Sequence, residues 1–375
     1  MLGRSFRLFR LLGFEVKVDL SWLVIAVLVA WSLAQGLFPL WAKGLSTAAY
    51  WWMGVAGALG LFVSIVFHEL VHSLVARRYG IQMKGITLFI FGGVAEMGEE
   101  PASPKAEFMM AVAGPVSSVA LGLVFWGFYL MGRAVAWPVP INGVLAYLGM
   151  LNGLLAGFNL LPAFPLDGGR VLRAGLWKWK KDLLSATRIA SWVGSGFGIV
   201  LVGLGVLSVI QGDFIGGIWW FLIGMFLRGA AQSSYQQVVM RHGLEGLKVR
   251  RFMEPNAVAV PPHTTVAQLV DNYIYRHHFK MFPVVDDGRL VGCVTLRQVK
   301  DIPRAEWDLR TVGELARSCS PDNAISPDAD AIQALSMMSR SQSSRLMVVE
   351  GDRLVGIIAL KDMLGFLSLK KELET

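Results

Sequence analysis

The stretch His68-Glu69-Leu70-Val71-His72 has the residue types and the spacing of a metal-dependent hydrolytic site. On a helix, His68 and His72 lie one turn apart on the same face, where their imidazoles can share one metal ion. Glu69 points about 100° away around the helix, so its carboxylate can stand beside the metal without taking a coordination position. Two neutral imidazoles that hold zinc, with a free carboxylate that accepts a proton from water, make up the arrangement for metal-assisted hydrolysis.

The surroundings of this motif distinguish it from a solvated histidine pair on a soluble helix. Between Trp51 and Ala76 the motif contributes every ionisable side chain, and the rest of the segment is apolar or small. A bilayer core is crossed by about 20 such residues. Ionisable groups inside a spanning segment are costly and mark a functional site. We therefore predict that the histidines bind a metal.

The composition indicates a polytopic α-helical membrane protein followed by a second domain. The 375 residues are 54% hydrophobic with 13 tryptophans, and the mean hydropathy of +0.52 excludes an ordinary soluble protein. Six apolar runs predict membrane-spanning helices: Leu20–Phe38, Trp51–Ala76, Ala106–Met131, Asn142–Pro162, Ala186–Ile210 and Phe214–Ala231. Both cysteines, Cys293 and Cys319, follow these runs, so the membrane half holds no disulfide framework.

The positive charge predicts the orientation in the cell membrane. The net charge of +8 arises in the first 249 residues, where basic side chains flank the apolar runs, so no nucleic-acid partner is indicated. Basic loops follow the second, fourth and sixth runs and include Arg77 and Arg78, whereas the opposite loops offer Lys43 and Arg133. The N-terminus and the C-terminal domain are therefore expected in the cytoplasm, with the histidine motif near that face of the bilayer.

A second polar site, Asn159 to Arg170, reads NLLPAFPLDGGR. Its two prolines end the fourth run, and irregular backbone at membrane depth is tolerated where it is buried or lines a cavity. Asp167 would stand on the same side of the membrane as the motif, and two histidines with one carboxylate form a catalytic zinc set. The alternative is that Asp167 caps a Gly168-Gly169 turn. Asn159 either polarises a substrate carbonyl or joins two helices by a hydrogen bond.

Residues Lys84 to Glu96, KGITLFIFGGVAE, predict two strands interrupted at Gly92-Gly93. An open strand cannot face lipid, because its backbone groups would lack hydrogen-bond partners. This membrane-associated β-hairpin is therefore either covered by protein or paired with another extended chain.

Two further stretches are assigned structural roles. The small residues from Ala111 to Pro115 favour close helix packing with a kink at the proline. The mixture of basic residues and tryptophan from Arg170 to Lys181 is typical of a helix at the surface of an anionic bilayer.

The C-terminal region contains an internal repeat. FPVVDDGRLVGCVTLRQV begins at Phe282, and LMVVEGDRLVGIIALKDM begins at Leu346. Each copy reads as strand, turn, strand and the start of a helix, with expected helices upstream at Val266–Tyr275 and Ala331–Ser339. Repeat units of this size are expected to pack as one pair.

Together these features resemble the site-2 protease family of intramembrane zinc metalloproteases over residues 1–231. The repeat resembles a pair of CBS domains of α+β fold, one over residues 252–310 and one over residues 311–375, after a linker at residues 232–251. The resemblance implies zinc on His68, His72 and Asp167, Glu69 as general base and later proton donor, and Asn159 as a substrate-binding group. It further implies that the hairpin around Gly92 and Gly93 receives the substrate as an added strand, and that substrates are transmembrane segments of membrane-tethered proteins.

CBS pairs commonly bind adenine nucleotides through a Ser or Thr near the last strand and an Asp three residues later. The first repeat has Thr295 but Gln298, and the second has Ala359 but Asp362, so each copy carries half of the pattern. The alternatives to nucleotide binding are packing against the membrane domain and dimerisation.

Two other functions remain open from the sequence: a CBS-regulated transporter or channel with a metal site, and an inactive membrane scaffold. A transporter predicts ionisable groups along several helices, whereas here the polar groups concentrate at the histidine motif and Asp167. A scaffold does not need Glu69. We expect an intramembrane zinc endopeptidase that the CBS pair regulates.

Overall fold

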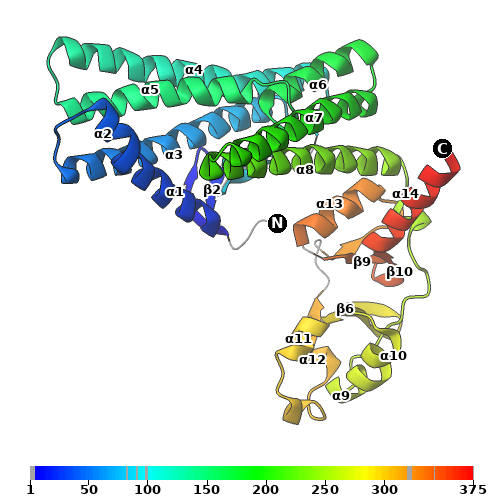
Figure 1. Ribbon diagram of the computed structural model, residues 1–375. Coiled ribbons are helices and arrows are strands. Elements are labelled where there is room, and N and C mark those ends of the chain that lie inside the picture. Colours follow the sequence, from blue (N-terminus) through cyan, green and yellow to red (C-terminus); the bar gives the residue numbers. More distant parts are fainter. Residues whose placement is uncertain are drawn as a thin grey trace. The chain divides into compact units, whose positions relative to one another are not determined.

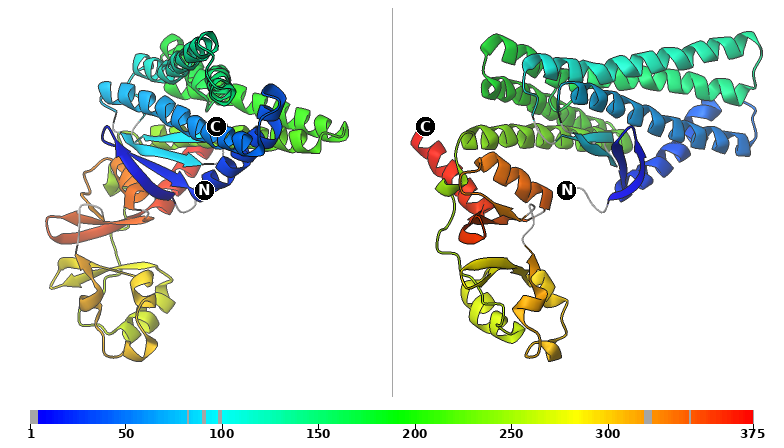
Figure 2. Two further views of the ribbon diagram at one scale, coloured as in Figure 1. Left: turned by 90° about the vertical axis from the view of Figure 1, so that its left-hand side faces the viewer. Right: turned by 180° about the vertical axis from the view of Figure 1, so that it is seen from behind.

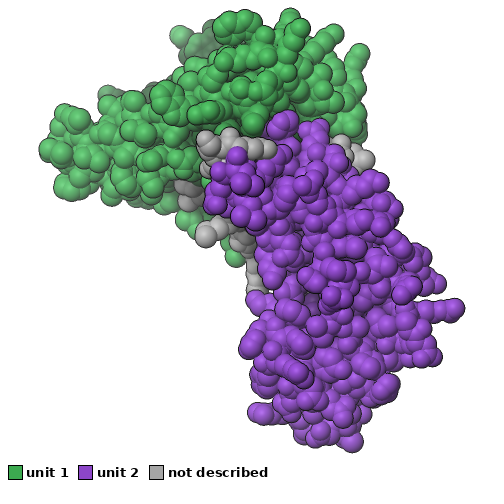
Figure 3. Space-filling model, turned by 90° about the vertical axis from the view of Figure 1, so that its right-hand side faces the viewer, with its two compact units in different colours: residues 1–236 green, residues 237–375 purple. Residues whose placement is uncertain are grey.

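The computed structural model describes residues 5–81, 83–89, 92–97, 100–318, 323–341 and 343–374. The chain divides into two compact units, residues 1–236 and residues 237–375 (Figure 3). Each unit is described by itself below.

Unit 1 is a helical membrane bundle. Among the described residues, six helical segments are long and apolar enough to cross a bilayer: Leu20–Trp41, α3 (Thr47–Arg78), α4 (Pro104–Ala134), α5 (Val139–Asn159), α7 (Leu183–Ile210) and α8 (Phe214–Leu244). The first segment consists of α1 (Leu20–Ser32), a π-helical turn (Leu33–Leu37) and α2 (Phe38–Trp41). Figure 1 shows α4 and α5 running side by side along their length. The six expected spans are therefore present.

The limits of all six spans differ from those expected from the sequence, and two of the differences have a clear cause. The fourth ends at Asn159 rather than Pro162, because Pro162 disfavours helical backbone at the residue before it. The sixth continues past Ala231 to Leu244, where the chain is too polar to be recognised as a membrane span. The α4 helix runs without interruption through Pro115.

Side-chain caps begin several of these helices. In each case an oxygen of the residue before the first turn accepts a backbone N–H two or three positions later, which satisfies a donor that the helix leaves free. The caps are Asp19 for α1, Ser46 for α3, Ser103 for α4 and Asp182 for α7.

A four-stranded sheet accompanies the bundle, in the order β1 (Ser5–Leu11), β2 (Phe14–Asp19), β3 (Met83–Phe89), β4 (Gly92–Met97). The β2 and β3 strands pair in parallel, with Glu15 opposite Gly85, and the other pairs are antiparallel. The expected hairpin is thus β3 and β4, and it joins strands of the same chain. Gly92 and Gly93, expected at the break, instead open β4; residues 90 and 91 lie outside the described part.

Strands β1 and β2 were not expected from the sequence, because Arg7, Arg10 and Lys17 were counted among the basic side chains that flank the first apolar run. The alternation of β2 places Phe14, Val16 and Val18 on one face, where they pack with Ile86 and Leu88 of β3. This layer covers Val66 and Leu70 of α3, as Figure 2 shows for the strands beside that helix. The sheet is therefore fixed to the part of α3 that carries the histidine motif.

The helix α6 (Asp167–Lys180) follows α5 and does not span the membrane. Lys178 and Trp179 are exposed, which agrees with a helix at the bilayer surface. The inclusion of Arg173 in that surface was wrong, because its side chain is buried and pairs with Glu107 of α4. Residues of α6 thus hold the helix against α4 as well as against the interface.

Unit 2 has the α+β fold expected of the repeat. Its elements are a 3₁₀ turn (Val249–Arg251), α9 (Val266–Gln268), a π-helical turn (Leu269–Ile274), α10 (Tyr275–His277), β5 (Met281–Asp286), β6 (Arg289–Thr295), α11 (Leu296–Lys300), a second 3₁₀ turn (Arg304–Glu306), α12 (Val312–Leu315), β7 (Arg317–Ser318), β8 (Ala324–Ile325), α13 (Ala331–Ser341), β9 (Arg345–Glu350), β10 (Arg353–Ala359) and α14 (Leu360–Glu374). The strands form one sheet in the order β5-β6-β10-β9-β8, with β7 beside β6.

The two repeats pair through β6 and β10, where Arg289 lies opposite Arg353. Each repeat also buries an apolar cluster of its own, one around Phe282 and one around Leu346. Cys293 is buried between Met281 and Met347 where the repeats meet, and Cys319 lies outside the described residues. The expected packing of the repeats as a pair is found, together with a separate core in each.

Residues 232–251, expected as a linker, are described as the end of α8 and the first 3₁₀ turn. Leu244 and Val249 are fully buried in the cluster around Leu346, which belongs to the second repeat. The segment that precedes the first repeat therefore completes the core of the second.

We expect Leu244→Ala to destabilise the second repeat by about 2–5 kcal/mol, because it opens a cavity in that cluster. Hydrogen exchange of the β9 and β10 amides should become faster. Leu369→Ala, at a side chain that is 61% exposed on α14, is the matched control and should change exchange little. Unchanged exchange in Leu244→Ala would show that the end of α8 does not support this core.

Candidate metal centre

The α3 helix presents both histidines to the interior of unit 1. His68 and His72 are 3% and 7% exposed, and their Nε2 atoms are 3.1 Å apart. Glu69 is partly exposed. The four-residue spacing thus brings the two imidazoles together, while the neighbouring carboxylate stays accessible.

The other ring nitrogens are fixed by α4. His72 Nδ1 donates to the backbone oxygen of Met110 at 2.7 Å, and His68 Nδ1 lies 2.8 Å from the Ser118 hydroxyl. Because a carbonyl only accepts, Nδ1 of His72 carries a proton, which leaves Nε2 as the nitrogen that can bind a metal. Such partners orient histidine ligands and fix their tautomer.

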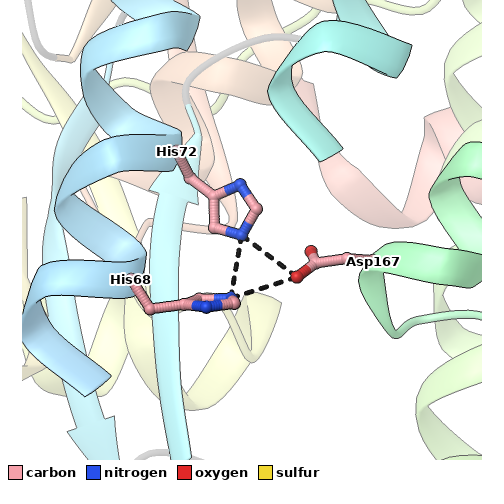
Figure 4. A group of neighbouring side chains, drawn as sticks. All are labelled: His68, His72 and Asp167. Carbon is pink, nitrogen blue, oxygen red and sulfur yellow. Dashed lines mark hydrogen bonds and ion pairs between the residues drawn. The ribbon is translucent and has the colours of Figure 1, made fainter. Parts of the chain in front are cut away.

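Asp167 is the first residue of α6, and its Oδ2 lies 3.1 Å from Nε2 of both histidines (Figure 4). Burial would raise the pKa of the Asp167 carboxyl, but the two imidazoles hold the pKa below its usual range. The side chain is therefore an ionised carboxylate, the form that binds a cation.

Glycine makes this position of Asp167 attainable. Gly168 and Gly169 belong to α6 rather than to a turn. A Cβ at Gly168 would overlap the backbone of Leu160, and a Cβ at Gly169 would overlap that of Phe164. The start of α6 therefore packs directly on the preceding loop, and that close backbone contact aims Asp167 at the histidines.

The three donor atoms fit a zinc ion. One nitrogen from each histidine and one carboxylate oxygen converge within 3.1 Å of one another, close to the roughly 3.3 Å between donors of a tetrahedral site with bonds of about 2.0–2.1 Å. Opposite them lies Gly114 of α4. A Cβ there would overlap Nε2 of His72 and stand 2.6 Å from Nε2 of His68. The absence of a side chain at Gly114 keeps the space in front of the donors open.

These donors line a cavity of about 570 Å³ within unit 1. Its walls come from α1, α3, the hairpin, α4, α5, α6 and α8. The residues singled out from the sequence that line it are His68, Glu69, His72, Gly92, Gly93, Asn159 and Asp167. The structure thus brings all the expected metal, catalytic and substrate-binding residues to one cavity.

The hairpin reaches Glu69 through Gly93. A Cβ at Gly93 would stand 2.8 Å from Cγ of Glu69 and 3.2 Å from Cγ2 of Ile65, so β4 passes close against α3 only because this residue is glycine. Gly92 has φ of +129°, a backbone conformation that favours glycine. The start of β4 is therefore held beside the carboxylate.

Asn159 ends α5 and faces the same cavity. Its Nδ2 donates to the backbone oxygen of Leu155 at 2.9 Å, within its own helix. That bond uses one of the two N–H donors of the amide. This hydrogen bond lies within α5, so the amide nitrogen does not make the expected alternative, a hydrogen bond between two helices.

The two CBS residues lie in unit 2, on different repeats. Thr295 ends β6, and its hydroxyl donates to Oε1 of Gln298 at 2.6 Å. Asp362 lies in the first turn of α14. The structure therefore does not join them in one repeat, and the Thr295 hydroxyl is already engaged by the residue that replaces the expected aspartate.

The contributions of α4 were not predicted from the sequence. The Ala111–Pro115 stretch was assigned to packing alone, which was incomplete, because Gly114 faces the metal donors. Ser118, one turn further along, is a polar residue in an apolar run and could have been noticed. The Met110 acceptor is a backbone oxygen, and no side chain signals it.

Comparisons with known proteins find relatives over nearly the whole chain. The family model "Peptidase family M50" matches residues 56–136 and 130–203, and the model "CBS domain" matches residues 249–303 and 312–369. The protein Rip3 of Mycobacterium tuberculosis is 35% identical over 356 residues, which cover 94% of this chain and 90% of Rip3. Zinc metalloprotease MJ0392 of Methanocaldococcus jannaschii is 32% identical over 375 residues, which cover 99% of each chain.

Among solved structures, the site-2 protease from Methanocaldococcus jannaschii is 32% identical, with a TM-score of 0.44 over 61% of this chain and 94% of that one. The full-length relatives above span both the membrane unit and the CBS pair. The chain therefore belongs to peptidase family M50, the site-2 protease family, and is a multi-pass membrane metalloprotease that carries a pair of CBS domains.

Proposed function

We propose that this protein cleaves transmembrane segments of other membrane proteins, with zinc bound by His68, His72 and Asp167. The observation that carries the proposal is the convergence of these three donors beside Glu69, in one cavity of a membrane-spanning unit. When bound, zinc would polarise the scissile carbonyl and lower the pKa of water toward about 7.

The residues of the chain would do the remaining chemistry. Glu69 accepts a proton from the attacking water and passes it to the leaving amine, which requires a carboxylate that is near the donors but not bound among them. Asn159, which lines the same cavity, holds the substrate backbone. The hairpin at Gly92 and Gly93 supports an extended substrate, because a helical peptide bond is shielded and already hydrogen-bonded.

The cytoplasmic orientation is part of the proposal. His68 and His72 lie in the last third of α3, which ends in Arg77 and Arg78. Lys178, Lys180 and Lys181 follow Asp167 along α6. Because basic residues concentrate on the cytoplasmic side, these positions favour a metal centre near that face, where water can reach it.

The CBS pair is proposed to regulate the protease. Its support is the CBS match in a chain whose relatives span the same two units. An adenine nucleotide at Thr295 or Asp362 stays a prediction, and the hydrogen bond from Thr295 to Gln298 weakens the case for the first repeat.

The transporter alternative has less support. Outside the metal centre, the buried charged side chains among the described residues of unit 1 are Asp19, which caps α1, and the Glu107–Arg173 pair. A permeation path would call for such groups along several helices.

We expect the detergent-purified protein to contain about one zinc per chain, lost on prolonged chelation. His68→Ala and Asp167→Ala should each lose most of the zinc, because each removes one of three protein ligands. Metal analysis of the three proteins side by side is the measurement. Absence of zinc from carefully prepared wild type would contradict the proposed site, and zinc retained in Asp167→Ala alone would require a different third ligand.

Glu69→Gln should keep the zinc and the fold but lower the cleavage of a model transmembrane substrate by about 10²–10⁴-fold, because it removes only the proton acceptor. The rate is measured in detergent or liposomes at equal zinc content. Cleavage at the wild-type rate would show that another group acts as base.

Gly114→Ala should reduce zinc content and cleavage together, because its Cβ would occupy the space in front of the histidine donors. Gly127→Ala, on the same helix with no neighbouring atom within 4 Å of its Cβ position, is the matched control and should retain both. Equal zinc in the two variants would mean that the metal does not occupy the space beside Gly114.

A further inference from the structure

An ion-pair cluster inside unit 1 involves none of the metal donors. Arg173 of α6 is 2% exposed and Glu107 of α4 is fully buried. Nε and Nη2 of Arg173 both contact Oε1 of Glu107, and Nη2 also lies 3.1 Å from Oε2 of Glu100. Burying such charges removes their hydration, so a pair of this kind contributes little net stability by itself. Its geometry suggests a different role.

The pair joins the two helices that complete the metal centre. On α4, Glu107, Met110 and Gly114 are spaced three and four residues apart and so share one face. Met110 accepts the hydrogen bond of His72, and Gly114 lies in front of both histidines. The face of α4 that orients the histidines is therefore the face to which Arg173 fixes α6, the helix that begins with Asp167.

Arg173 also contacts the loop that leads to Asp167. Its guanidinium carbon lies 5.1 Å from the centre of the Phe164 ring, which is 3% exposed. The backbone of Phe164 in turn packs against Gly169 of α6 and Gly194 of α7. Arg173 thus contacts elements on both sides of Asp167 in the chain: the loop before it and, through Glu107, the helix opposite.

We propose that Arg173, paired with Glu107, is a positioning residue that holds Asp167 in place as the third metal ligand. This inference rests on the proposed zinc site. A planar guanidinium donates in fixed directions to both carboxylates, so it sets the position of α6 in a way that a flexible ammonium group does not. Loss of the pair leaves Asp167 chemically intact but free to move, and residues that orient metal ligands typically contribute about 10–100-fold to metal affinity.

The test measures two quantities for the full-length protein in detergent. One is the zinc dissociation constant, from competition with a chromophoric chelator, and the other is the Tm of the zinc-free protein. Arg173→Met should bind zinc at least about tenfold more weakly than wild type. Arg173→Lys keeps the positive charge that faces Glu107 and Glu100 but loses the planar fork of donors, so it should weaken zinc binding while changing the zinc-free Tm little. Lys178→Met removes an exposed charge from the same helix and should leave both quantities as in wild type.

Two results would overturn the inference. One is wild-type zinc affinity in Arg173→Met. The other is a loss of affinity confined to variants whose zinc-free Tm also falls, which would make the pair a part of the fold only. Asp167→Ala is measured in the same series. If it binds zinc as tightly as wild type, the proposed zinc site itself is wrong, which is a different result from the two above.

Discussion

The structure depends on one constraint: a hydrolytic site needs polar and charged groups in a part of the chain built to face lipid. Each such group must find a partner inside the bundle, because an unpaired one is costly there. His72 and His68 meet Met110 and Ser118 of α4 through Nδ1, and Asp167 meets the two Nε2 atoms. The polar residue one turn before the motif, Ser64, accepts a hydrogen bond from the buried Asn152 of α5 at 2.9 Å. Ser64, His68 and His72 of α3 are thereby matched by polar partners on α4, α5 and α6.

The α4 helix positions the other parts of this arrangement. It carries no proposed ligand, yet Glu107, Met110, Gly114 and Ser118 follow one another at three- and four-residue spacing and meet α6 and α3 in turn. A helix is stiff over one or two turns, so groups on a single face keep their separations. The histidines of α3 and Asp167 of α6 lie about 95 residues apart in sequence. Both are positioned by contacts with the same face of α4.

What the sequence predicted well was local. The HELVH spacing and the PLDGG stretch each carry their geometry within a few residues, and apolar length defined the six spans. What it missed depends on tertiary contact. Arg173 was grouped with Lys178 and Lys180 because no nearby residue in the sequence indicates that it pairs with a carboxylate on α4. Gly114 was taken as packing because the atoms it must clear belong to α3. The β1 and β2 strands were missed because the basic residues of this region drew attention to its charge. The alternation of Phe14, Val16 and Val18 in β2 was therefore not recognised as a strand pattern.

The difference in burial between His68 and Glu69, adjacent in the chain, suits the separate tasks that we propose for them. A ligand works best when its ring is fixed, and His68 is 3% exposed with Nδ1 engaged. A general base must meet water and then the leaving amine, so its carboxylate has to keep access to the cavity. Glu69 lies on the side of α3 where β4 passes, and an ordinary side chain at Gly93 would press on it at 2.8 Å. Glycine at that position lets the strand approach α3 closely without pressing on the Glu69 side chain, as the proposed support of an extended substrate requires.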